Sequence, residues 1–348
     1  MKHPLLLTPA LLLVTSVLSA QAQTAQTSSA RTLITLPAAV ASALSAGSTV
    51  RDAQTGVASS ASTLKAVLAD PSTLASVLLA AQQASALAQA QLSQARLIAT
   101  QNAVNAFTAL YQSQAQTELQ QLQIGVDAKA LQVAQVKLST RNGTALDVQN
   151  AQNTLSSSKQ TLLDTQAQLL VNSQKLANVI GRPGSYSAST PPNAPAVKRN
   201  TALSSSYPTL LKDQQAVDTA ALSVRLADNE FTARVTLDQA RTTLSNAQST
   251  LASDQKTLLT TLATAQSTAE AAQANYQAAL QTEANTQASY KQDGVRLQSG
   301  TISAVALQQS QLTLKKAQYA RAQALVAVWQ SLAALSTASG QNVTGLAQ

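Results

Sequence analysis

The stretch that decides the fold begins at an Asn-Gly turn and runs from residue 142 to residue 180: NGTALDVQNAQNTLSSSKQTLLDTQAQLLVNSQKLANVI. Large apolar residues recur in it every seven positions, and a row of smaller residues follows three positions after each. The first row is Val148, Leu155, Leu162, Leu169 and Leu176, and the second is Ala151, Ser158, Thr165, Asn172 and Val179. These rows are the a and d positions of a heptad, so the stretch predicts a helix that packs lengthwise on another helix.

The same pattern returns 159 residues later, which indicates an internal duplication. Its a positions are Leu307, Leu314, Arg321, Val328 and Leu335, and its d positions are Ser310, Ala317, Ala324, Ser331 and Ala338. Only Arg321 interrupts the apolar a row. Gly181 aligns with Gly340 at this offset, whereas Gly143 and Gly300 differ by 157, which predicts a first turn two residues shorter than the second.

Helix-breaking residues fall in few places: Asp70-Pro71, Asn142-Gly143, residues 181–208 and Ser299-Gly300. The segments between them predict helices at about 36–69, 72–139 and 146–180, and again at about 208–230, 235–297 and 303–339. Each long helix is roughly as long as its two shorter neighbours together, at about 1.5 Å per residue. We therefore predict an all-α fold, a tandem repeat of long antiparallel coiled-coil hairpins with little or no β-structure.

The start of the chain is typical of a secretory signal peptide over residues 1–22. Lys2 and His3 precede an apolar stretch, and Ala20-Gln21-Ala22 is a cleavage motif. An uncleaved anchor is the alternative, but the apolar stretch is shorter than the roughly 20 residues that a membrane span needs. The mature chain then divides into a first repeat (23–181), a Pro/Ser-rich linker (182–206) predicted to be a surface connector, a second repeat (207–340) and a tail (341–348).

Composition argues against catalysis and against nucleic-acid binding. The chain has no Cys, its one His is His3, and its carboxylates are scattered, so no catalytic residue, metal ligand or cofactor site is predicted and an enzyme is not expected. The formal charge is +8, yet only 11% of residues are charged and base-stacking aromatic clusters are missing, so no nucleic-acid partner is predicted.

At these residues the sequence resembles the TolC family of outer-membrane efflux and secretion ducts, over nearly the whole mature chain. The resemblance rests on residues 33–44 and 207–211, on the turn and helix start at 142–151, on the second turn at 299–301, and on Trp329, Leu335 and Gly340 near the end. It implies a homotrimeric helical tube in the cell envelope, at the outer membrane or in the periplasm, that works with an inner-membrane pump and a periplasmic adaptor.

The resemblance further implies that the two turns dock the adaptor, through Asn142, Gly143, Thr144, Asp147, Ser299, Gly300 and Thr301. Local chemistry explains the same residues without docking. Glycine supplies the positive φ that ends a helix, and Thr144 with Asp147 is a capping pair for the next helix.

Two departures from the family shape the expectation. The family inserts two transmembrane strands in each repeat, but no alternating segment of ~10 residues occurs near Asp70 or Phe231, so these strands are predicted to be missing. Ala306 and Gln309 stand where entrance carboxylates would be expected in the second repeat, so carboxylate gating is not predicted. The alternative function is a non-conducting periplasmic coiled-coil spacer or adaptor. A trimer with a lumen favours the duct, whereas a narrow monomer or dimer favours the spacer.

Overall fold

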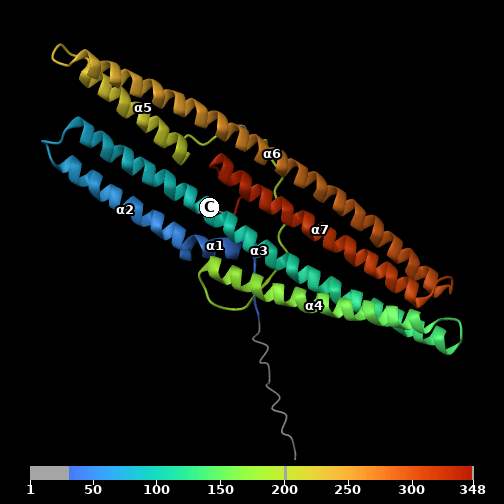
Figure 1. Cartoon of the computed structure of the whole chain (residues 1–348). Helices are drawn as coiled ribbons and strands as arrows, with labels where there is room; N and C mark the ends of the chain where they lie inside the picture. Colours follow the sequence, from blue (N-terminus) through green and yellow to red (C-terminus); the bar gives the residue numbers. More distant parts are fainter. Residues whose placement is uncertain (1–30, 200–201, 347–348) are drawn as a thin grey trace, which may run out of the picture. The chain divides into compact units, whose positions relative to one another are not determined.

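The computed structural model describes residues 31–199 and 202–346 and confirms the predicted all-α class (Figure 1). The predicted signal peptide lies outside the described residues. The described elements in chain order are β1 (Thr32–Ile34), α1 (Leu36–Ala46), α2 (Ser48–Ala69), α3 (Ala75–Ser139), α4 (Ala145–Ile180), β2 (Tyr186–Ala188), α5 (Pro208–Ala227), α6 (Arg234–Gln298) and α7 (Ala304–Ser339).

Each half of the chain is one long helix with shorter helices packed along it. In the first half α3 packs against α2 toward one of its ends and against α4 toward the other, and in the second half α6 packs in the same way against α5 and α7 (Figure 1). Both long helices have 65 residues, and α4 and α7 have 36 each. The bounds of all four helices keep the offset of 159, so each residue of α3 and α4 has an equivalent in α6 and α7.

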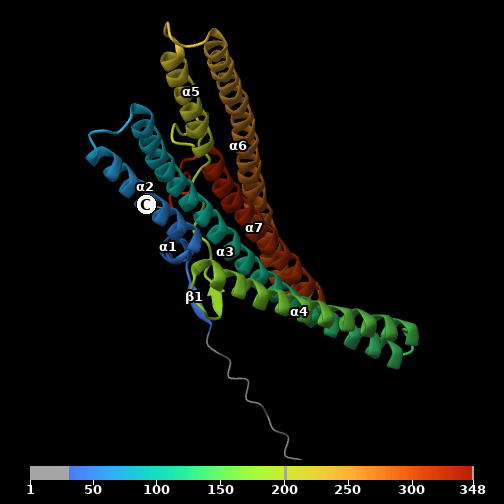
Figure 2. The same ribbon diagram turned by 60° about the vertical axis from the view of Figure 1, so that its left-hand side comes forward.

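The two halves join through α3, which packs against both α5 and α7 (Figure 2). Near one end, the Gln83 and Gln215 side chains each donate to the other residue's backbone carbonyl, at 3.2 and 2.9 Å. In the middle, Val104 and Phe107 of α3 share a core cluster with Trp329 of α7. The two largest buried side chains, Trp329 and Phe107, therefore lie where the halves meet.

The predicted helix over residues 36–69 is wrong in one respect, because it divides at Gly47 into α1 and α2. The Gly47 backbone is extended, with a ψ of 132°. A Cβ atom there would come too close to the Ala43 carbonyl oxygen, so only glycine fits this approach. The division lets α1 pack on both α3 and α4.

Two short connections stand where transmembrane strands would be inserted in the resembled family. Residues 70–74 join α2 to α3, and residues 228–233 join α5 to α6, with no strand at either place. Asp70 holds the first connection by accepting from the Ser72 backbone N at 2.9 Å, and α3 accordingly begins at Ala75 rather than residue 72. In the described part of the chain, no helix combines the length and the apolar character needed to cross a lipid bilayer.

The linker after α4 is not only a surface connector, which corrects the sequence prediction. Its strand β2 pairs in parallel with β1, and Tyr186 and Ala188 are buried. The Tyr186 backbone N donates to Ser173 Oγ at 2.7 Å, and the Trp329 indole N donates to the Pro192 carbonyl at 3.0 Å. The first part of the linker is thus a strap that packs against α4 and α7.

Candidate docking turns and the repeat interface

The predicted capping pair joins the turn between α3 and α4, residues 140–144, to the first turn of α4. The Thr144 backbone N donates to Asp147 Oδ2 at 2.8 Å, and the Asp147 backbone N donates to Thr144 Oγ1 at 3.2 Å. The backbone hydrogen bond from Thr144, followed by the bond from its hydroxyl, lowers the pKa of Asp147. This reciprocal cap fixes the direction in which α4 leaves the turn.

The residue with positive φ in this turn is Arg141, at 61°, and not Gly143 as the sequence predicted. Gly143 is required for a different reason. A Cβ atom there would lie 2.9 Å from Lys137 Cβ and 3.3 Å from the Leu138 backbone N, against the last turn of α3. The glycine therefore permits a close approach of the chain to the helix it has just left.

The second turn, residues 299–303, has the same length as the first, so the predicted difference of two residues is wrong. Gly300, with a φ of 72°, aligns with Arg141 at the offset of 159 rather than with Gly143. Thr301 Oγ1 donates to the Arg296 carbonyl at 2.8 Å. Ser303 caps α7 by accepting from the Ala306 backbone N at 3.1 Å, a role that its alignment with Thr144 would have revealed.

Both turns lie at the same end of the hairpins, and the connections at 70–74 and 228–233 lie at the other (Figure 1). Four of the seven predicted docking residues lie in or just after the first turn and three lie in the second, and Figure 2 shows the two tips apart from each other. Asp147 has no acidic counterpart in the second turn, because Ala306 takes the equivalent position. The two turns consequently share a backbone shape but not a charge pattern.

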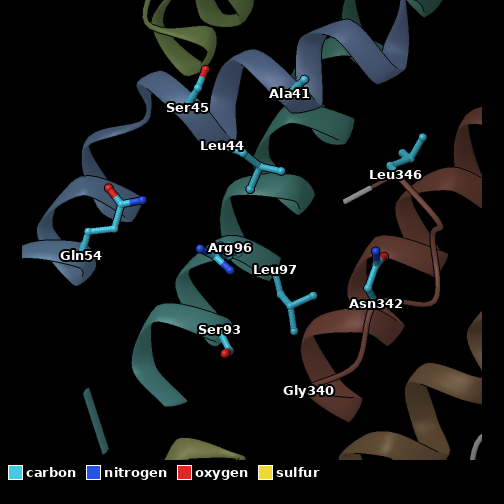
Figure 3. A pocket seen from close by; sticks show the side chains of 10 residues that line it. All are labelled: Ala41, Leu44, Ser45, Gln54, Ser93, Arg96, Leu97, Gly340, Asn342 and Leu346. Atoms are coloured by element: carbon cyan, nitrogen blue, oxygen red, sulfur yellow. The ribbon is translucent and has the colours of Figure 1, made fainter. Parts of the chain in front are cut away.

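A surface pocket of about 620 Å³ lies between α1, α2, α3 and the residues that follow α7 (Figure 3). Leu44 and Leu97 project into it, and Asn342 faces it from the opposite side. The pocket's lining includes Arg96 but no His, Cys, Asp or Glu. Its two serines, Ser45 and Ser93, therefore have no side chain in the lining that commonly serves as a general base.

The interface between the halves has a defined face on α7. Its a and d residues pack toward α6, and a second stripe, off those rows, is buried as well: Ala322, Val326, Trp329 and Ala333. Beside this stripe, Gln330 Nε2 donates to Thr108 Oγ1 of α3 at 3.2 Å. On α3, the matching stripe is Thr100, Val104 and Thr108, which is buried too. The second stripe of α7 thus belongs to the contact with α3.

The equivalents of both faces are exposed in this chain. On α4, the positions 159 residues before the α7 stripe are Leu163, Ala167, Leu170 and Gln174, all exposed. Leu170 is 56% exposed, whereas its equivalent Trp329 is 2% exposed. On α6, the equivalents of the α3 stripe are Leu259, Ala263 and Ser267, which are exposed and line a groove of about 520 Å³. We call these the α4 face and the α6 face.

Comparison with known proteins places the fold. The chain is similar to the outer-membrane channel OprN, with 15% identity and a TM-score of 0.64 over 90% of this chain and 91% of that chain. It is similar to the outer-membrane protein VceC from Vibrio cholerae, with 14% identity and a TM-score of 0.63 over 88% of this chain and 96% of that chain. It is also similar to the outer-membrane channel CmeC from Campylobacter jejuni, with 11% identity and a TM-score of 0.62 over 88% of this chain and 86% of that chain. These are outer-membrane efflux channels of the TolC family, so the resemblance found in the sequence is confirmed at the level of the fold. No family model matches the sequence, and no curated protein matches it.

Proposed function

We propose that this chain is the subunit of a helical duct in the cell envelope, in which copies pack side by side into a tube for efflux or type I secretion. The observation that carries the proposal is the pair of exposed faces on α4 and α6. Each is the equivalent of a face that is buried between the two halves of the same chain. A second copy would cover them with the contact that the chain already makes internally.

This contact is heterologous, because the α4 face of one copy meets the α6 face of the next. A heterologous contact repeated around an axis closes into a ring or continues as a filament. The solved structures with this fold are outer-membrane channels, which favours the closed ring. We infer three copies from the TolC family, with Gln, Ser and Thr side chains facing the lumen.

The turns at 140–144 and 299–303 would form one mouth of this tube. Their ordered caps hold Thr144, Asp147 and Thr301 in fixed positions, which suits docking of a periplasmic adaptor that connects the duct to an inner-membrane pump. A duct that docks a periplasmic adaptor would lie in the outer membrane or in the periplasm, so we propose one of these locations for the chain.

The first experiment is light scattering and negative-stain microscopy of the purified chain, with and without detergent. A trimeric ring with an open centre is the expected result. A thin monomer or dimer in both conditions would contradict the duct and support the non-conducting spacer. The short connections at 70–74 and 228–233 are the structural feature that favours this alternative.

A cross-linking experiment tests the contact between copies. The chain has no native Cys, so only the introduced cysteines can react. Val171 and Ser267 are the equivalents of Gln330 and Thr108, whose side chains hydrogen-bond between the halves. The Val171→Cys/Ser267→Cys chain with a short bis-maleimide should give covalent dimers and trimers. Each single-cysteine chain should stay monomeric on a denaturing gel, because a heterologous contact never brings two identical positions together.

A further inference from the structure

The two ends of the hairpins differ in charge. Residues 120–162 and 279–321, which surround the two turns and which we call the turn end, contain nine Lys or Arg and four Asp or Glu. Equal lengths of chain at the opposite end, residues 48–90 and 207–249, contain six Lys or Arg and seven Asp or Glu. Most of the formal charge of +8 therefore lies at the turn end.

The four carboxylates of the turn end are already bound within the chain. Asp127 is buried and accepts from Ser158 Oγ at 2.5 Å, across the α3–α4 packing. Asp147 belongs to the capping box of α4. The other two form ion pairs with arginines of the same end, Asp293 with Arg296 at 3.2 Å and Glu283 with Arg321 at 2.7 Å. No carboxylate of the turn end is left to neutralise the remaining basic residues.

The remaining basic side chains are exposed: Lys129, Lys137, Arg141, Lys159, Lys291 and Lys316. Within residues 31–199 and 202–346, none of them forms an ion pair. Local structure explains one, because Lys137 lies in the last turn of α3, where the helix carbonyls favour a cation. The others have no such role, so the turn end presents an excess of positive charge to its surroundings.

Arg141 is the most unusual member of this set. It has a φ of 61°, a conformation that strains a residue with a Cβ atom, and its equivalent in the second turn is Gly300. Its backbone is fixed by donation to the Leu138 carbonyl at 3.0 Å, and the Asn142 N donates to the Lys137 carbonyl at 2.8 Å. Glycine would form this turn without strain. Strained residues that persist cluster at functional sites, which indicates a role for the Arg141 side chain outside the fold.

We propose that the first turn binds an acidic surface of a partner protein, with Arg141 pairing with one of the partner's carboxylates. This inference rests on the proposed docking of an adaptor at the turns and adds the chemistry of the surface that docks. A guanidinium group matches a carboxylate through two parallel hydrogen bonds. The surplus of lysines around it would speed the encounter with an acidic partner. An anionic membrane is the other source of negative charge, but a fluid surface gains nothing from an arginine held in one strained backbone conformation.

Fluorescence anisotropy of a labelled helical peptide rich in Glu and Ala tests the proposal. The purified wild-type chain should bind this peptide at low salt, bind it more weakly at high salt, and ignore the equivalent peptide rich in Lys and Ala. Arg141→Gln should weaken binding about threefold to fivefold, the effect of losing one exposed ion pair. Arg141→Gly should bind as weakly although its backbone is relaxed, whereas Arg141→Lys should retain most of the affinity.

Arg234→Gln is the matched control, because Arg234 is also exposed but lies beside the connection at the opposite end. It should bind the acidic peptide as the wild type does, and circular dichroism of every variant should match the wild type. Equal weakening by Arg141→Gln and Arg234→Gln, or failure of the wild type to bind the acidic peptide, would overturn the proposal. Binding to phosphatidylglycerol vesicles that depends on Arg141, without binding to the peptide, would overturn it in favour of a membrane.

The inference and the duct can fail separately. A trimeric ring that does not bind the acidic peptide contradicts only the inference. A monomer that binds the peptide through Arg141 supports the acidic partner and contradicts the duct.

Discussion

At the residue scale, a few polar pairs distinguish two hairpins whose helices have equal lengths, α3 with α4 and α6 with α7. Arg321 interrupts the heptad of α7, and its Nε lies 2.7 Å from Glu283 Oε2 on α6. The N–H does not point at the carboxylate, so the contact is an ion pair without an aligned hydrogen bond. The equivalent positions in the first half are Leu162 and Ile124. One hairpin therefore has an ionic seam contact where the other has apolar residues, which disfavours exchange of α4 and α7.

We predict that Arg321→Leu lowers the free energy of unfolding by roughly 1–2 kcal/mol, because Glu283 keeps its charge in a half-buried site without a partner. The double variant Arg321→Leu/Glu283→Ile should recover most of that loss. Urea denaturation monitored by circular dichroism measures both. Equal stability of the single and double variants would contradict a pairing role for Arg321.

A second polar pair makes the α5–α6 packing sensitive to pH. Burial raises the pKa of Asp213, and the neighbouring charge of Asp254 on α6 raises it further, while Lys212 acts in the opposite direction. A raised carboxyl pKa means that the folded chain binds the proton more tightly than the unfolded chain. Its stabilising effect is complete below the ordinary Asp pKa of about 3.9 and is lost as pH rises through the folded pKa.

Asp213→Asn should therefore raise the free energy of unfolding at pH 7 and change it less at mildly acidic pH, since the amide resembles the protonated acid. Denaturation midpoints at the two pH values give the comparison. The same gain at both would assign the effect to packing rather than to the proton.

Sequence reasoning could locate Arg321, because it breaks a visible row, but not its partner. The face that α6 turns toward α7 depends on packing, and Glu283 stands in no comparable row. The pair of Asp213 and Asp254 was equally hidden, because two residues on different helices become neighbours only after the hairpin register is known. Thr144 and Asp147 were predictable, since a capping box is encoded within four consecutive residues.

At the element scale, the two turns have the same length but different residues at the position with positive φ. Arg141 and Gly300 occupy equivalent positions with φ near 61° and 72°. A side chain with a Cβ atom is strained there by roughly 1–2 kcal/mol, and glycine is not. The first turn is thus the more strained of the two.

Arg141→Gly should stabilise the chain by about 1 kcal/mol, and Gly300→Ala should destabilise it by a similar amount, because one relieves and the other introduces that strain. Thermal unfolding by calorimetry would measure the two shifts. Shifts of the same sign in both variants would show that the two turns do not share a backbone conformation.

Elements that repeat a strong period over many residues were predicted well, and α3, α4, α6 and α7 begin and end within three residues of the predicted bounds. The division at Gly47 was missed because a single glycine is compatible with a helix until tertiary contacts favour the break. Strands β1 and β2 were missed because each has three residues, too few for a detectable alternation. The length of the first turn was misjudged because Gly143 was aligned with Gly300, although their backbone roles differ.

At the scale of the whole molecule, the internal duplication predicts which exposed residues another copy covers. Leu170 is exposed although its equivalent Trp329 is buried, so it belongs to a covered face. Val295 is exposed as well, but so is its equivalent Val136, at 61%, which places this pair outside the contact. We therefore expect Leu170 to be covered by another copy and Val295 to stay exposed.

Leu170→Glu should abolish assembly and leave a folded monomer, whereas Val295→Glu should assemble as the wild type does. Light scattering gives the mass, and circular dichroism verifies that helices remain. A monomer in both variants, or a ring in both, would show that the faces were assigned wrongly.

The constant offset of 159 also sets the kinds of boundary that a closed ring can have. Boundaries inside a chain would alternate with boundaries between chains, and the two would be built from equivalent helices but different side chains. Inside the chain the boundary contains Trp329 and the strap, whereas between chains it would contain Leu170 and the open groove of α6. Such a ring would have strong and weak seams in alternation, so it could dilate at every second seam while the intervening ones stayed closed.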